Sequence, residues 1–505
     1  MPTRLSALAP EIVQIFHNHG FHLEGIEQHL GAAGMAALFR GEPAAVRYAA
    51  RGNSAIEQLI RLVLLRDAAP YQCFVDMFGE PLVQGLLDCD ALLFQNSNTL
   101  QFQIDIRPHI FLNTHHWVFS DADAAMTVHI PGPDHVLGVG AASLSLVQAS
   151  PTNKVSTVLD LGTGSGVQAL AQSACAQHIT AIDIHPRALE FAAASFAASN
   201  VAAELLCGPW FEPVHGRRFD RIVANPPFVV GLPEVGHIYR DSGFNLDGAS
   251  ELVISQAHHY LNPGGCAVML AAWIHTPGES WQQRVASWLP DTGVAAWVIQ
   301  RDIADPALYV GTWLQDESLD PRSIAAAART EAWLEHFEQA NVSGIGFGFV
   351  AIQRIDDHTE SDILCEDMPQ QCEGPLGEEI TEYFARITWL RDADITEILE
   401  TKFGMRPGVA VEEISVVDTD AGIGFRPAAL RLTRTDGPRW SHDVDRHLYA
   451  IVSGLSTAGL SLGEIVELYC AAHDLDVQAM LPEVVGAIVD LIRHGFVLPS
   501  ELIEL

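Results

Sequence analysis

Residues 155–184 contain the pattern that most restricts the fold of this chain. A β-branched run, Thr157-Val158-Leu159-Asp160-Leu161, leads into a glycine-rich turn, then a helical stretch and a second apolar run that ends at Asp183. Two apolar runs joined through a turn and a helix favour a parallel βαβ unit. The glycines of the turn permit positive φ and leave room for a ligand beside the main chain. The pattern therefore predicts an α/β domain with a ligand at its strand ends.

The acid that ends the second run suggests what the ligand contains. Asp183 follows Asp160 by 23 residues, which places its carboxylate at the tip of the neighbouring strand, where it can accept both ribose hydroxyls of an adenosyl group. A nicotinamide dinucleotide enzyme needs Gly-x-Gly-x-x-Gly after the first strand. Here the third residue after Gly164 is Val167, so the glycine spacing departs from that fingerprint.

A second motif follows the apolar run Phe219–Ala224. The next four residues are Asn225, Pro226, Pro227 and Phe228. The Asn side-chain oxygen and the carbonyl of Pro226 can each accept one hydrogen of an NH2 group, and the two prolines stiffen the turn. Phe228 offers a face for a flat substrate. The tetrad is therefore suited to holding a planar nitrogen so that its lone pair can attack.

With these motifs in this order, residues 155–272 resemble a class I S-adenosylmethionine-dependent methyltransferase of the Asn-Pro-Pro-(Tyr/Phe) group. That group includes HemK-type protein-glutamine, RsmC-type ribosomal RNA guanine and adenine-amine methyltransferases. The resemblance implies S-adenosylmethionine as cofactor, Asn225 as the holder of the acceptor nitrogen and Phe228 as a stacking surface. It implies cofactor contacts from Asp160, Gly162, Thr163, Gly164 and Gly166 at the methionine end and from Asp183 at the ribose.

One position departs from the family. Relatives often have Gly-Asp-x-Phe-x-Pro before the catalytic strand, with the Asp accepting from the cofactor adenine, whereas this chain has Pro209 at the Asp position. Adenine recognition is then expected from a main-chain group or from stacking, with Trp210 or Ile184 as candidates. Core packing is an equal explanation for Trp210. The segment 136–140 resembles the stretch that caps the cofactor pocket in these families.

The rest of the chain is long enough for several domains. The predicted fold class is α/β, with a Rossmann-like, doubly wound core, a helical winged-helix-like N-terminal module and an acidic α+β C-terminal domain. The predicted boundaries are 1–100 for the helical substrate module, 101–150 for a mixed β connection, 151–355 for the catalytic domain, 356–380 for an acidic linker and 381–505 for an interaction domain that is also winged-helix-like.

Charge limits the choice of partner. The formal net charge is −35, and residues 355–505 hold 29 acids and 10 bases. Such a balance disfavours nonspecific nucleic-acid binding and favours protein contact or self-association for the C-terminal domain. Arginines between positions 40 and 66 form a small exception, interpreted as a solvated helix face. Cysteine spacing predicts no metal, and no apolar stretch is long enough to span a membrane, so we expect a cytoplasmic protein.

Three functions remain open at this point. The first is N-methylation of an exocyclic amine of a nucleobase, favoured in RNA because an extra domain precedes the core as in RsmC-type enzymes. The second is methylation of a glutamine amide in a protein, which the chain-wide acidity favours. The third is a catalytically silent scaffold that binds the cofactor. The tetrad does not distinguish the first two, because both acceptors are planar sp² nitrogens.

Overall fold

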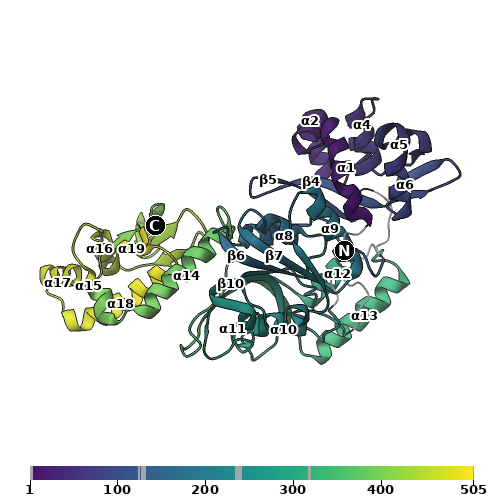
Figure 1. The fold of residues 1–505 in the computed structure, drawn as a ribbon. Coiled ribbons are helices and arrows are strands. Elements are labelled where there is room, and N and C mark those ends of the chain that lie inside the picture. Colours follow the sequence, from purple (N-terminus) through teal and green to yellow (C-terminus); the bar gives the residue numbers. More distant parts are fainter. Residues whose placement is uncertain (1–3, 123–125, 127–131, 234–241, 317–319, 504–505) are drawn as a thin grey trace. The chain divides into compact units, whose positions relative to one another are not determined.

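The computed structural model describes residues 4–122, 126, 132–233, 242–316 and 320–503. The chain divides into two compact units: residues 1–147 with 152–367, and residues 148–151 with 368–505. Each unit is described by itself (Figure 1).

An eight-stranded sheet is the centre of the first unit. Its strand order is β13-β11-β12-β10-β9-β6-β7-β8, with β12 antiparallel to both neighbours and every other pair parallel. The strands are β6 (Val155–Leu161), β7 (Ala176–Asp183), β8 (Glu204–Cys207), β9 (Phe219–Ala224), β10 (Leu261–His275), β11 (Val294–Ala304), β12 (Gly344–Arg354) and β13 (Asp362–Asp367). The chain runs from β6 outward to β8 and then returns to β9, so the order reverses between β6 and β9. Ligands of such sheets bind outside the carboxyl ends of the strands at this switch point.

Helices cover both faces of this sheet (Figure 1). Successive residues of a strand point to opposite faces, and accordingly Ala181 packs in a cluster with α8 and α9 while Ile182 packs in a cluster with α10 and α11. The helical segments of the core are α7 (Ala141–Ala149), α8 (Val167–Gln172), α9 (Pro186–Ala198), η2 (Glu212–Val214), α10 (Gly248–Ala257), η3 (His258–Tyr260), α11 (Trp281–Ala286), α12 (Pro306–Asp316) and α13 (Ile324–Gln339). The predicted doubly wound α/β core is therefore confirmed.

The N-terminal module has the order and pairing of a winged helix. After α1, α2 and α3, a helix, a short strand, two helices and two strands follow, and the sheet order β1-β3-β2 pairs the first strand with the last. The elements are α1 (Arg4–Asn18), α2 (Leu23–Phe39), α3 (Pro43–Ala49), α4 (Ala55–Leu59), the π-helical turn η1 (Ile60–Leu64), β1 (Ala69–Pro70), α5 (Tyr71–Phe78), α6 (Glu80–Asp88), β2 (Leu92–Phe94) and β3 (Thr99–Phe102). The arginines of this module lie mostly in local contacts: Arg40 pairs with Glu42, and Arg47 pairs with Asp67.

A hairpin of β4 (Ile104–Phe111) and β5 (Thr114–Asp121) fastens the module to the core. Two α9 serines one turn apart, Ser195 and Ser199, accept the backbone N–H groups of Phe119 and Trp117 at 2.9 Å each. These bonds satisfy donors on the outer edge of β5 that would otherwise be buried without a partner. Because α9 contacts both α1 and β7, it connects the module to the β7 side of the sheet.

The second unit is α+β. Its elements are α14 (Leu376–Asp392), α15 (Ile395–Glu400), β14 (Phe403–Met405), β15 (Val409–Val417), β16 (Phe425–Arg434), β17 (Ser441–Asp443), α16 (Arg446–Ser453), α17 (Leu462–His473), α18 (Val477–Arg493), β18 (Val497–Pro499) and α19 (Ser500–Ile503). Three buried charges lie at its centre, where Glu379 accepts from Arg386 at 2.6 Å and from Arg434 at 2.7 Å. Burial of ionised groups is tolerated only when they pair in this way.

Two sequence expectations differ from the structure or lie beyond it. The segment 356–380 is not a linker, because residues 362–367 form β13, the edge strand beside β11, and α14 already begins at Leu376. Within the expected mixed β connection at 101–150, residues 123–125 and 127–131 lie outside the described residues. Within the described part of the chain, no helix has the length and apolarity to span a membrane.

Candidate active site

The predicted site residues come from three neighbouring strand ends. The glycine loop follows β6, Asp183 ends β7 and the Asn-Pro-Pro-Phe tetrad follows β9. The loop and the tetrad adjoin: a Cβ placed on Gly162 would lie 3.7 Å from Cα of Pro226 and 3.9 Å from the carbonyl oxygen of Asn225. The structure therefore brings the motifs together at the switch point of the sheet.

Asp160 holds the glycine loop from beneath. It is fully buried, and its Oδ2 accepts the Thr163 hydroxyl at 2.7 Å and the Ala169 N–H at 3.0 Å. The Thr163 hydroxyl is thus used within the loop. Oδ1 of Asp160 has no hydrogen-bond partner among the described residues. Burial raises the pKa of Asp160 to about 7; the two hydrogen bonds oppose this rise, and the charge on Asp183 adds to it.

Gly164 and Gly166 have different structural roles in the loop. Gly164 has φ of +54°, and a Cβ there would meet nothing within 4 Å, so the loop is open beside it. Gly166 has φ of +91°, and its Cβ would lie 2.7 Å from the Phe196 ring of α9. Gly164 therefore leaves space for a ligand, whereas Gly166 is required by the packing of α9 against the loop.

Asp183 links the glycine loop to the end of β7 through a hydrogen bond. Its Oδ2 accepts the Gly164 N–H at 2.9 Å, and its Oδ1 accepts the His185 N–H at 2.9 Å. Each carboxylate oxygen keeps a second lone pair for a ligand hydroxyl. Burial raises the pKa of Asp183, although these hydrogen bonds act in the opposite direction. The next residue, Ile184, is 56% exposed and gives the strand end an apolar surface.

Asn225 is half-buried and lies against the helix that precedes the core. Its Nδ2 makes a long hydrogen bond of 3.5 Å to Oγ of Ser143 in α7, which leaves Oδ1 to accept from a substrate. The same segment is tied to the loop region, because Gln168 donates to the carbonyl of Ser143 and Ser165 donates to that of Leu137, both at 2.8 Å. The sequence analysis did not predict a role for Ser143, although Ser143 closely follows segment 136–140, which was expected to cap the cofactor pocket.

The chain beyond the tetrad is held by an insertion between β11 and β12. The Val230 N–H donates to the buried Tyr309 hydroxyl of α12 at 2.7 Å, and the Trp333 ring of α13 lies 3.1 Å from the Cβ position of Gly231. Phe228 packs in part against the same cluster and keeps part of its ring exposed. No local pattern in the sequence connected these helices with the tetrad.

Trp210 follows the carboxyl end of β8 by three residues. It adopts φ of +49°, is half-buried and meets Phe244 edge to face at 5.9 Å between ring centroids. Its partial packing against the core leaves both the packing and the stacking explanation available.

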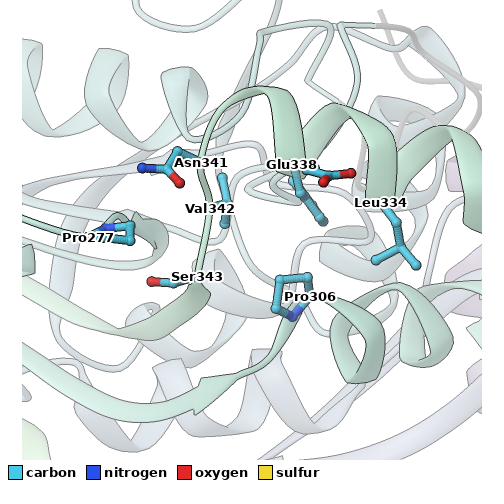
Figure 2. A pocket seen from close by; sticks show the side chains of 8 residues that line it. Pro277, Pro306, Leu334, Glu338, Asn341, Val342 and Ser343 are labelled. Carbon is cyan, nitrogen blue, oxygen red and sulfur yellow. The ribbon is translucent and has the colours of Figure 1, made fainter.

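A cavity of about 280 Å³ lies elsewhere, where α13 faces the ends of β10 and β12 (Figure 2). Leu334 and Glu338 of α13 line one side, and Asn341 and Ser343 lie on the turn into β12. It contains no residue of the glycine loop or the tetrad, so we do not assign it to the site.

The loop and strand ends fit S-adenosylmethionine. This cofactor carries an ammonium group, two ribose hydroxyls and a flat adenine. The unpartnered Oδ1 of Asp160 suits the ammonium, Asp183 has lone pairs for the hydroxyls, and Ile184 or Trp210 offers an apolar face. The open space at Gly164 gives the cofactor room beside the main chain. The described residues hold no group of three or more His, Cys, Asp or Glu side chains arranged for a metal ion.

Comparisons with known proteins agree with this fit. Residues 137–276 match the methyltransferase small domain, so this part of the chain is a class I methyltransferase domain. Residues 18–98 and 381–499 match two domains of unknown function, DUF7059 and DUF7782.

Among curated proteins, the chain is similar to ribosomal RNA small subunit methyltransferase C of Salmonella choleraesuis (strain SC-B67) and of Salmonella typhi. Each is 30% identical over 151 residues, which is 30% of this chain and 41% of the relative. The chain thus covers about two fifths of the length of these relatives.

Solved structures similar to the chain include the T. Thermophilus 16S rRNA N2 G1207 methyltransferase (RsmC) in complex with AdoMet and guanosine. That match has 17% identity and a TM-score of 0.27, and covers 47% of this chain and 65% of that one. An rRNA methylase from Streptococcus thermophilus matches with 12% identity and a TM-score of 0.24, covering 43% and 95%.

Proposed function

We propose that the class I methyltransferase domain at residues 137–276 transfers a methyl group from S-adenosylmethionine to an exocyclic amine of a nucleobase in RNA. The observation that carries the proposal is the contact between the glycine loop and the tetrad, with Gly162 beside Pro226. A cofactor on the loop and an acceptor on the tetrad would then meet at one place. The bound cofactor supplies an electrophilic methyl group on a sulfonium; the chain supplies placement and electrostatics.

The tetrad addresses the weak nucleophilicity of the acceptor. An aryl amine delocalises its lone pair into the ring, which makes the nitrogen planar and unreactive. Oδ1 of Asn225 and the carbonyl of Pro226 would each accept one N–H, and these bonds favour a more tetrahedral nitrogen. Ser143 supports this role by occupying the other end of the Asn225 amide. A strong base is not required, because the product loses its proton after transfer.

The hairpin of β2 and β3 in the N-terminal module, residues 91–104, which we call the wing, supports RNA as acceptor. Residues 91–104 contain no charged side chain, although the chain as a whole is strongly acidic. Phe94 is 51% exposed and stacks on Tyr71 with ring centroids 6.2 Å apart, and residues 95–98 expose three amide side chains and a serine. Exposed aromatic faces and amides bind unpaired bases by stacking and by hydrogen bonds to base edges. The relatives named above are ribosomal RNA methyltransferases.

The net charge of −35 favours a second candidate, a glutamine amide in a protein. A protein acceptor has no phosphate backbone to neutralise, and the exposed Arg40 and Arg47 of the module are already paired with acids. The tetrad would hold this nitrogen in the same way.

Replacement of Asn225 by Ala tests the catalytic assignment. We expect loss of methyl transfer, because the acceptor loses one of its two hydrogen-bond acceptors. Cofactor affinity, measured by calorimetry, should stay within several-fold of wild type, since the glycine loop and Asp183 are untouched. Turnover retained in the variant would refute the role of Asn225. A chain that binds cofactor normally and methylates neither RNA nor protein would instead be the silent scaffold.

A further inference from the structure

The hairpin of β15 and β16 in the second unit exposes apolar side chains at its far end. The three-stranded sheet has the order β15-β16-β17, so β15 is an edge strand nine residues long. Val417 is 59% exposed, Phe425 73% and Ile423 81%. Among the described residues, β17 pairs only with residues 431–433 of β16, and no third strand pairs with the far half of the hairpin.

The two edges of this hairpin differ in how they are protected. On β16, Pro427 removes a backbone donor, and a bulge interrupts the ladder, because Ile414 pairs with Ala429 and Ser415 already pairs with Pro427. Proline and bulges are devices that stop an edge from pairing with another chain. β15 contains no proline and no lysine or arginine, and five of its nine residues are β-branched. Its free edge is therefore competent to pair with a further strand.

The charges near the free edge of β15 determine which kind of strand can pair with it. β15 and the turn after it carry four acids, Glu412, Glu413, Asp418 and Asp420, and no base. On β16, Arg431 lies across from Glu412 but pairs with Asp443 at 2.7 Å. Glu412 and Glu413 lie on opposite faces of β15, and both are exposed. A second copy paired antiparallel in the register that sets Glu412 against Glu413 would oppose like charges, which destabilises a strand pair. A nucleic acid is disfavoured for the same electrostatic reason.

We propose that the free edge of β15 binds an extended segment of a partner protein, rich in lysine or arginine and in β-branched residues, as an added strand. Main-chain hydrogen bonds supply much of the affinity in this mode, and side chains in register supply specificity. The basic side chains of the partner would lie on the face of β15 that carries Glu412, and its apolar side chains would cover Val411 and Val417 on the opposite face. This proposal is independent of the methyl acceptor.

The test uses the full chain and defined peptides. The probe is the fluorescent peptide Lys-Val-Thr-Val-Lys-Val-Thr-Val-Lys, and the matched peptides replace every Lys by Glu or the central Lys by Pro. We expect saturable binding of the Lys peptide by fluorescence anisotropy, and binding at least tenfold weaker for both matched peptides. Hydrogen exchange should show protection at residues 409–417 when the Lys peptide is added.

Two double variants with the same change in charge distinguish binding at the β15 edge from a general effect of the acidic surface. Glu412→Lys with Glu413→Lys should weaken binding at least tenfold, whereas Glu467→Lys with Glu483→Lys, on α17 and α18, should leave it within twofold. Failure of wild type to bind the Lys peptide would overturn the proposal. Equal losses in the two double variants, or equal binding of the proline peptide, would do so as well. Light scattering that shows a dimer with residues 409–417 protected in the absence of peptide would assign the edge to self-association instead.

Discussion

We predict that the buried carboxyl of Asp160 makes cofactor binding depend on pH. Burial raises its pKa to about 7, so the folded protein without ligand holds this group largely neutral below that pH. An ammonium beside Oδ1 requires the ionised form. Binding at lower pH must therefore remove a proton from Asp160, and cofactor affinity should rise as pH rises through 7.

The size of the effect follows from the pKa. With a pKa of about 7, roughly one molecule in ten has Asp160 ionised at pH 6 and about three in four at pH 7.5. Apparent affinity scales with the competent fraction, so the dissociation constant should fall about eightfold over this range. Calorimetry at pH 6, 6.5, 7 and 7.5 measures this slope. Paired buffers of different ionisation enthalpy should show release of nearly one proton at pH 6.

Asp160→Asn supplies the control. The amide can still accept from Thr163 and Ala169, but it does not titrate, so its affinity should be lower and independent of pH between 6 and 7.5. Asp183→Asn should keep most of the wild-type slope, because it leaves Asp160 in place. A flat wild-type profile, or an unchanged slope in Asp160→Asn, would refute the placement of the cofactor ammonium beside Asp160.

The remaining predictions concern the ribose, the loop and the wing. Asp183→Ala should weaken cofactor binding measured by calorimetry, and an unchanged affinity would mean that this acid does not hold the ribose. Gly166→Ala should lower stability by about 1–3 kcal/mol, because the new Cβ meets the Phe196 ring at a positive φ; thermal melting checks this, and Phe196→Leu added to it should restore part of the loss. Phe94→Ala should raise KM for an RNA acceptor several-fold and leave cofactor affinity unchanged, whereas an unaltered KM would remove the wing from acceptor binding.

The sequence was informative where one short segment determines both conformation and chemistry. The glycine loop, Asp183 and the tetrad each follow an apolar run, and parallel strands bring such ends to one edge of the sheet. Local patterning also predicted the winged-helix-like module, because its helices and its strand pair are short, regular and close in sequence. The residue roles themselves stay predictions until they are tested by substitution.

Long-range contacts were not predictable in this way. Ser143 reaches Asn225 across 82 residues, and Tyr309 reaches Val230 across 79, with no periodicity to connect them. Strand β13 contains three acids in six residues and therefore had the composition of a linker, although it pairs with β11 at the edge of the sheet. Gly166 was assigned to the cofactor because it belongs to the motif, whereas the packing of Phe196 already explains its lack of a side chain.

The most direct test of the proposed function labels a lysate that lacks this protein. Purified enzyme and S-adenosylmethionine with a radioactive methyl group are added, and equal portions are then digested with RNase or with protease. The proposed function predicts label that RNase removes from the macromolecular fraction and protease does not, and no label with Asn225→Ala. Label that only protease releases would contradict the nucleobase acceptor and support a glutamine amide.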